Sequence, residues 1–122
     1  VVDKSWHRLW SIRMENPLED AEKLRIADGR ISQIGEKTEN ISEIDAQYIG
    51  LIKVKKSFIQ NFFSTYHELH DNTSKDQMFM TTLLQLIADK YNALAPVVIN
   101  GGWIEVDSCE DLAAYEKHGV WI

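Results

Sequence analysis

Two carboxylates near the end of the chain have the type and spacing to act on a ligand. Acidic side chains alternate with apolar ones in residues 104–107, a pattern that predicts a strand with Glu105 and Asp107 on one face. Trp103 would lie on the same face. Asp107 would then stand at the carboxyl end of a strand, where open α/β sheets bind their ligands. The two acids are therefore candidates for contacting a ligand.

A helix start follows these acids and offers Asp107 a different role. Ser108 has the character of an N-cap, and Asp111 three positions later completes a capping-box pattern. Asp107 could then simply help Ser108 to cap the helix, and Glu105 could be a solvated acid. The residues by themselves leave both interpretations open.

The composition limits the classes of protein to consider. The chain has 122 residues, 44% hydrophobic and 26% charged, which predicts one globular domain. A net charge of -6 argues against a general binder of nucleic acid or anionic membranes. One cysteine, Cys109, excludes an intrachain disulfide framework and favours a reducing compartment. No apolar run reaches about 18 residues. We expect a cytoplasmic protein.

The patterns along the chain predict the elements that must position these acids. Helical spacing of apolar residues predicts helices over 4–14, 55–70 and 78–91. Asp28-Gly29 predicts a hairpin turn between strands at 21–26 and 30–34. Residues 48–54 and 95–99 have the apolar character of strands, the first of them buried. This order of elements predicts an α/β fold with a mixed sheet.

Several short motifs, in their order and spacing, resemble the sugar-nucleotidyltransferase-like superfamily. Residues 102–108 with Glu110-Asp111-Leu112 resemble its C-terminal strand and helix. Further motifs resemble one branch of this superfamily, which contains phosphocholine cytidylyltransferase and its phosphonate-processing relatives. These motifs are Trp6, Trp10, Arg13, Pro17, Asp20-Ala21-Glu22, residues 34–37 and residues 48–51. The resemblance covers nearly the whole chain, although Thr82 stands where many relatives have an aspartate.

The resemblance implies a three-layer, Rossmann-like fold and a transfer reaction. Members of the superfamily join a nucleoside triphosphate to a phosphorylated substrate and release pyrophosphate. Their N-terminal half carries a Gly-rich phosphate loop and a metal-binding aspartate, and this sequence has no match to either. We therefore expect residues 1–122 to be the C-terminal, acceptor-binding half of such a domain, which would be inactive by itself.

The resemblance also implies roles for individual polar residues. Asp107 would complete a magnesium site with an aspartate of the other half, and Glu105 is a candidate second ligand. Magnesium suits this place, since it takes one or two carboxylates together with phosphate and water. Lys37 would contact the acceptor phosphate as a point charge. An ordinary surface position for Lys37 is the alternative.

The remaining candidates would bind the acceptor itself. Trp6 with Asp20 would recognise a cationic head group, because ammonium groups bind to aromatic faces next to a carboxylate. The alternative is that Trp6 and Trp10 pack the helix onto the sheet. Gly50 could bring the backbone against the acceptor or only relieve packing. Trp103 could line the same cavity or fill the core.

Three functions follow as hypotheses. The first is part of a magnesium-dependent cytidylyltransferase that uses CTP and a small phosphorylated amino-alcohol, such as phosphocholine or an aminoalkylphosphonate. The second is a non-catalytic α/β module that docks on another domain or subunit. The third is a nucleotidyltransferase acting on a sugar-1-phosphate, distinguished by whether Trp6 and Trp10 face the cavity. Unpaired strand edges would make the isolated chain self-associate.

Overall fold

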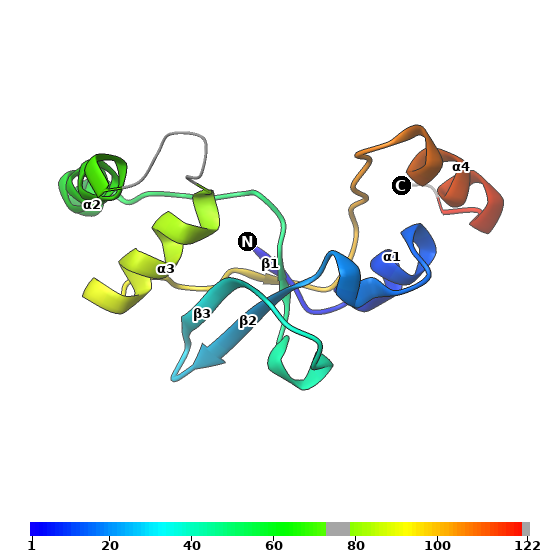
Figure 1. Ribbon diagram of the computed structural model, residues 1–122, viewed down its shortest axis with the longest axis horizontal. Coiled ribbons are helices and arrows are strands. Elements are labelled where there is room, and N and C mark those ends of the chain that lie inside the picture. The colour runs from blue at the N-terminus through cyan, green and yellow to red at the C-terminus, as the bar shows by residue number, and fades with distance from the viewer. Residues whose placement is uncertain (73–78, 121–122) are drawn as a thin grey trace.

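The computed structural model describes residues 1–72 and 79–120. Figure 1 shows an α/β fold in which short strands lie between two groups of helices. One group holds α1 (Trp6–Arg13) and α4 (Cys109–His118), and the other holds α2 (Ile59–Asn72) and α3 (Met80–Tyr91). None of the helices in the described ranges is long and apolar enough to cross a membrane.

A three-stranded mixed sheet stands in the middle. β1 (Val2–Asp3) pairs antiparallel with β4 (Gln47–Tyr48) on one side and parallel with β5 (Val98–Ile99) on the other. The prediction of an α/β fold with a mixed sheet is thereby confirmed. Because β1 and β5 are parallel, Asp3 and Ile99 end at the same edge of the sheet, and the chain leaves this edge toward α1 and α4.

A hairpin of β2 (Glu22–Ala27) and β3 (Arg30–Lys37) forms a second sheet. Its turn has φ angles of 50° at Asp28 and 72° at Gly29, as a tight hairpin turn requires. The predicted hairpin is confirmed. α3 docks on β3 through Gln85, whose side chain accepts a hydrogen bond from the Ile34 amide at 2.8 Å.

Two apolar clusters hold the fold together. The first packs the sheets against α3 and consists of Val2, Leu24, Ile31, Ile34, Ala46 and Leu84. The second packs α1 against α4 and consists of Trp6, Leu9, Trp10, Ala21, Ile44 and Tyr115. The second cluster fixes α1 against α4, and Glu105 and Asp107 lie in the segment that leads into α4.

The predicted buried strand over 48–54 is wrong. β4 ends at Tyr48, and Leu51 is 60% exposed. Gly50 has a φ of 82°, which breaks the extended backbone. Beyond the paired residues Val2 and Tyr48, the Ile49 amide donates a hydrogen bond to the Val1 carbonyl, and the backbone then leaves the sheet.

The strand predicted around Glu105 and Asp107 is also wrong. β5 covers Val98–Ile99 within the predicted 95–99, and residues 103–107 have no regular structure. Gly101 and Gly102 have positive φ angles of 72° and 84°, which turn the chain away from the sheet. β1 ends at Asp3, so no neighbouring strand is present to extend the ladder beyond Ile99.

The predicted helices are present with shifted ends. α1 lies within 4–14, and the helix expected over 55–70 consists of a 3-10 turn (Lys56–Phe58) followed by α2. α3 covers most of 78–91, although Met78 lies outside the described residues. The predicted start of α4 is confirmed, since Ser108 and Asp111 form a reciprocal capping box.

Candidate functional site

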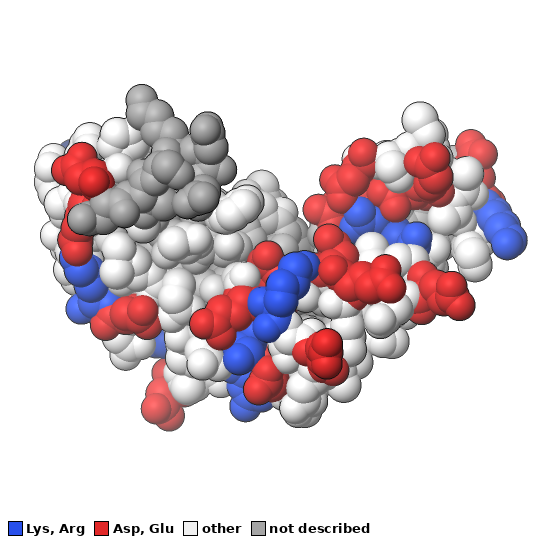
Figure 2. Space-filling view, in the orientation of Figure 1, with Lys and Arg blue, Asp and Glu red and all other residues white. Residues whose placement is uncertain are grey.

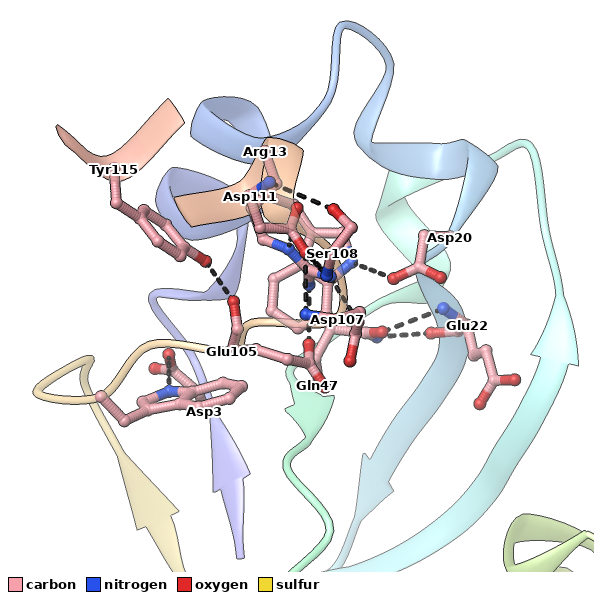
Figure 3. Close-up of polar contacts among 12 residues, drawn as sticks. Asp3, Arg13, Asp20, Glu22, Gln47, Glu105, Asp107, Ser108, Asp111 and Tyr115 are labelled. Atoms are coloured by element: carbon pink, nitrogen blue, oxygen red, sulfur yellow. Dashed lines mark hydrogen bonds and ion pairs between the residues drawn. The ribbon is translucent and has the colours of Figure 1, made fainter. Parts of the chain in front are cut away.

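A buried arginine gathers the acids at the end of the chain. Arg13 lies in the last turn of α1, and its side chain is only 4% exposed. Its Nη1 atom lies 2.7 Å from Glu105 Oε2, its Nη2 atom 2.5 Å from Asp107 Oδ2, and its Nε atom 3.1 Å from Asp111 Oδ1. Figure 3 shows the three carboxylates around this one side chain. Glu105 and Asp107 thus face the same way, although the backbone between them is not a strand.

Asp111 is the fixed member of this group. Its Oδ2 atom accepts hydrogen bonds from the Asp107 amide at 2.9 Å and the Ser108 amide at 3.2 Å, in addition to the contacts with Arg13. The hydrogen bond from Arg13 and those from the two amides hold the pKa of Asp111 below its ordinary value, more strongly than burial raises it. Asp111 therefore stays ionised and holds the guanidinium in place.

The pKa values of Arg13 and Glu105 depend on their burial and on the charges next to them. Burial by itself would lower the pKa of Arg13, but its hydrogen bonds to Asp111 and Asp107 raise that pKa above its ordinary value. Burial and the charge of Asp107 raise the pKa of Glu105, and Arg13 only partly offsets this shift. The site therefore combines a permanent cation with a carboxyl group that is harder to ionise than usual.

A second polar group lies beside this one, at the start of β2. Trp10 Nε1 donates a hydrogen bond to Asp20 Oδ2 at 2.9 Å, and Lys37 Nζ donates to the carbonyl of Asp20 at 2.8 Å. Burial raises the pKa of Glu22, and the charges of Lys37 and Asp20 act on it in opposite directions. The structure thus places Lys37 beside the backbone of Asp20, and the roles of both residues in acceptor binding stay predictions.

Gln47 anchors this second group to the central sheet. Its side-chain oxygen accepts from the Glu22 amide at 3.0 Å, and its side-chain nitrogen donates to the Glu22 carbonyl at 2.6 Å. Because Gln47 pairs with Asp3 in the sheet, β2 begins next to the carboxyl end of β1. Figure 3 shows Gln47 and Glu22 in the same region as Arg13 and Asp111.

The tryptophans form a packed row. Trp6 and Trp10 are 3% and 4% exposed, and the rings of Trp10 and Trp103 lie edge to face with centroids 6.1 Å apart. Trp103 Nε1 donates to Asp3 Oδ2 at 2.9 Å, and Asp3 is itself buried. In this conformation the rings of Trp6 and Trp10 have no open face, so a role of Trp6 in binding a cationic head stays a prediction.

Gly50 lies apart from the other candidates. It follows β4 at the end opposite to Gln47, next to Leu51, whose carbonyl accepts a hydrogen bond from the Val1 amino group. A Cβ atom at Gly50 would have no neighbour within 4 Å. The structure therefore does not bring Gly50 to Arg13 or Lys37, and its role in acceptor binding is untested.

Two cavities among the described residues differ in their distance from the candidate site. A cavity of about 270 Å³ opens at the carboxyl ends of β1 and β5, between Asp3, Arg8, Asn100 and Trp103. A larger one of about 390 Å³ is lined mainly by residues of the segments 51–58 and 93–97, with apolar side chains of β3 and α3 at its base. The smaller cavity shares Trp103 with the candidate site and lies where α/β folds bind ligands, whereas the larger one is remote from Arg13.

The carboxylates of the described residues do not by themselves form a metal site. Within residues 1–72 and 79–120, no three acidic, histidine or cysteine side chains are arranged to hold a metal. Magnesium usually takes one or two carboxylates and completes its shell with phosphate and water. Asp107 and Glu105 already face a cation, the guanidinium of Arg13, so a role of either acid in binding magnesium stays a prediction.

Arg13 is the residue of the site whose role sequence reasoning did not find. An arginine on the apolar stripe of the first helix, next to two tryptophans, was the available signal. Its partners are 92 to 98 positions away in the chain, so no local pattern connects them. Figure 2 shows that acidic residues surround a small basic surface at the end of the molecule that holds α1 and α4.

Comparison with known proteins gives one informative similarity. No family model matches the chain, and no solved structure matches it. The chain is 44% identical over 117 residues to CTP:phosphoglutamine cytidylyltransferase of Campylobacter jejuni subsp. jejuni serotype O:2. The match covers 92% of this chain and 46% of the relative, so the chain spans about half the length of the curated relative that it matches. Over nearly its whole length, the chain is therefore similar to part of a cytidylyltransferase.

Proposed function

We propose that residues 1–122 form the acceptor-binding part of a cytidylyltransferase that transfers CMP from CTP to a small phosphorylated acceptor. The observation that carries this proposal is the 44% identity over 92% of the chain to an enzyme named for that reaction. Since the match covers 46% of the relative, the proposed activity belongs to a protein that also supplies the nucleotide-binding residues.

The acceptor that the site suits best has both charged and polar groups. Lys37 and Asp20 lie together at the start of β2, with Glu22 beside them, so an anion and an ammonium or amide group could bind within a short distance. The buried rings of Trp6 and Trp10 offer no open cage to a quaternary ammonium. A phosphorylated amino acid amide, as in the name of the relative, therefore fits better than phosphocholine.

The chemistry requires no nucleophile from the protein. An oxygen of the acceptor phosphate attacks the α-phosphorus of CTP, the bond to the β-phosphate oxygen breaks, and pyrophosphate leaves. The protein must hold two anions together, which is a task of positioning and charge screening. Lys37 would hold the acceptor phosphate, and Asp107 with Glu105 would hold magnesium, which screens the triphosphate when bound.

Two other hypotheses remain alternatives to be tested. The non-catalytic docking module is favoured by the exposed apolar side chains near the larger cavity, such as Leu51 and Val97. The reaction on a sugar-1-phosphate would need the tryptophans to be pure core residues, which agrees with the burial of Trp6 and Trp10. Both share the fold with the favoured hypothesis and differ from it in substrate or activity.

The test is pyrophosphate release in the presence of magnesium and CTP. It uses the 122-residue chain and the longest natural protein that contains it. The acceptors are phosphoglutamine, phosphocholine, aminoethylphosphonate and a sugar-1-phosphate, and Asp107→Ala serves as the inactive control. We expect release by the longer protein with phosphoglutamine as the best acceptor. Absence of release with every acceptor, from folded protein, would leave the docking module as the better hypothesis.

A further inference from the structure

One face of the chain is apolar and is not covered by any described residue. It surrounds the larger cavity of about 390 Å³ and is formed by residues 51–58 on one side and residues 93–97 on the other. Leu51, from the first of these segments, is 60% exposed, and Val97, from the second, is 61% exposed. We call this surface the groove face. Large exposed apolar patches of this kind mark sites where a protein meets a partner.

The backbone beside the groove face also lacks partners. Residues 48–54 have the apolar composition of a buried strand, but β4 ends at Tyr48. The amides of residues 50–54 donate no hydrogen bond to any described residue. Figure 1 shows this stretch as part of a long connection from β4 to α2. Free amides that continue a strand at the edge of a sheet suit an added extended segment, whose carbonyls would accept their hydrogen bonds.

The charge of the groove face indicates the charge of its partner. The charged side chains that line the cavity are Arg30, Lys53 and Lys55, all of them basic and exposed. None of the three forms an ion pair with a described residue. Residues 46–67 contain three lysines and no acidic residue, although the whole chain has a net charge of -6. A partner with acidic side chains would therefore be complementary to this face.

We propose that the groove face binds a segment of the longer protein outside residues 1–122, an extended stretch with apolar and acidic side chains that pairs with residues 50–54. The inference rests on the proposed function, which assigns the nucleotide-binding residues to another part of the same protein. More than half of the cytidylyltransferase relative lies outside the match, which is enough chain to cover the face. The bound segment fills the cavity and extends the central sheet beyond β4.

The first test identifies the occupant by cross-linking the longest natural protein that contains this chain. Nitrogen-14 and nitrogen-15 forms of that protein are mixed and treated with a carbodiimide, which joins lysine amines to carboxylates in contact with them. We expect Lys53 and Lys55 to be joined to acidic residues outside residues 1–122, within one isotopic form. Lys117, in α4 and away from the cavity, is the control and should not join the same segment.

Each other cross-linking result counts against the proposal. Links from Lys53 or Lys55 between the two isotopic forms would identify a second copy as the occupant. Links only to acids within residues 1–122, or no link from either lysine, would show that no acidic segment of the longer protein lies on this face.

The second test measures hydrogen exchange of the backbone in the longer protein by mass spectrometry. The amides of residues 50–54 should exchange at least about tenfold more slowly than in an unstructured peptide, because the bound segment accepts their hydrogen bonds. Exchange of these amides at the rate of an unstructured peptide would overturn the proposal.

The third test asks whether Leu51 is buried in the longer protein. Leu51→Asp should lower its Tm by about 4 °C or more, because a charge would replace a covered apolar side chain. Ile41→Asp is the matched control, since Ile41 is 50% exposed and lies outside the cavity, and it should change the Tm by less than about 2 °C. Equal, small effects would contradict docking. If Leu51→Asp prevents folding, Leu51→Ala should lower the Tm in the same direction.

These readouts separate the inference from the proposed function. None of the three measurements uses CTP, an acceptor or turnover. Cross-links and slow exchange in a protein that releases no pyrophosphate would uphold the docking and refute the proposed activity. Pyrophosphate release by a protein whose residues 50–54 exchange freely would uphold the activity and overturn the docking.

Discussion

Arg13 Nη1 lies 2.7 Å from Glu105 Oε2, although the two residues are 92 positions apart in the chain. The contact joins the last turn of α1 to the irregular segment that leads into α4. The candidate site and the packing of these two helices therefore depend on the same guanidinium. Changes at Arg13 should affect both.

Removal of Arg13 should be costly for stability. Arg13→Ala leaves the buried carboxylate of Asp111 with its two amide hydrogen bonds but without its charged partner, and breaking a buried ion pair costs about 3 kcal/mol or more of unfolding free energy. Urea denaturation measures the loss. Arg8→Ala, at an exposed position of the same helix, should change the unfolding free energy by less than about 0.5 kcal/mol. Equal effects of the two changes would show that the ion-pair group does not stabilise the fold.

The pH dependence of stability should reveal Asp111. Its pKa is lower in the folded chain than in the unfolded one, so the unfolded state binds the proton more tightly. The stabilisation is present above the unfolded value of about 4 and is lost as pH falls through the lower folded value. In Asp111→Asn this acid-dependent loss should shrink, as measured by thermal unfolding between mildly and strongly acidic pH. The exposed neighbour Glu110 offers a matched control, Glu110→Gln, which should keep the parent profile.

Gly35 should tolerate no side chain. A Cβ atom there would lie 2.5 Å from Thr81 Cβ, and the φ angle of 93° disfavours any L-residue. Gly35→Ala should therefore push α3 away from β3 and cost more than about 2 kcal/mol of unfolding free energy. Gly29 also has a positive φ, of 72°, but a Cβ atom added there in Gly29→Ala would have no neighbour within 4 Å. It should cost only the backbone strain, about 1 kcal/mol. Denaturation of both variants against the parent checks the difference.

Lys37 should affect acceptor binding more than turnover. In the protein that shows activity, Lys37→Ala removes a cation next to Asp20 and should raise KM for the acceptor about tenfold with a smaller change in kcat. Lys23→Ala is the control on the same hairpin, since Lys23 pairs with Glu36 and Glu43 instead. Steady-state kinetics with varied acceptor measures both. An unchanged KM in Lys37→Ala would remove this lysine from the acceptor site.

The isolated chain should self-associate through its unpaired strand edges. Leu51 and Val97 are 60% and 61% exposed and border the larger apolar cavity. β4 and β5 are the two edges of the central sheet, and such edges invite pairing. Val97→Lys should weaken an association that analytical ultracentrifugation detects in the parent chain, whereas Val106→Lys, near α4, should not. A parent chain that sediments as a monomer at every concentration would contradict this prediction.

Features that depend on neighbours in the chain were predictable from the amino-acid sequence. Asp28 and Gly29 form the predicted hairpin turn because both accept positive φ angles, whatever surrounds them. Ser108 and Asp111 form the predicted capping box because the partners are three residues apart. The α/β class with a mixed sheet was likewise predictable from the order of helical and strand patterns.

Features that depend on distant partners emerged only in the folded chain. The strand pattern at Glu105 and Asp107 remained irregular, because β1 ends at Asp3 and leaves no neighbour to pair with. The burial of Trp6 depended on the packing of α1 against α4. Arg13 could be recognised as the centre of the acidic group only when its partners, more than 90 positions away, were brought to it. A strand needs a neighbouring strand, and a buried charge needs an opposite charge. Both partners can come from distant parts of the chain, so a local sequence pattern does not reveal them.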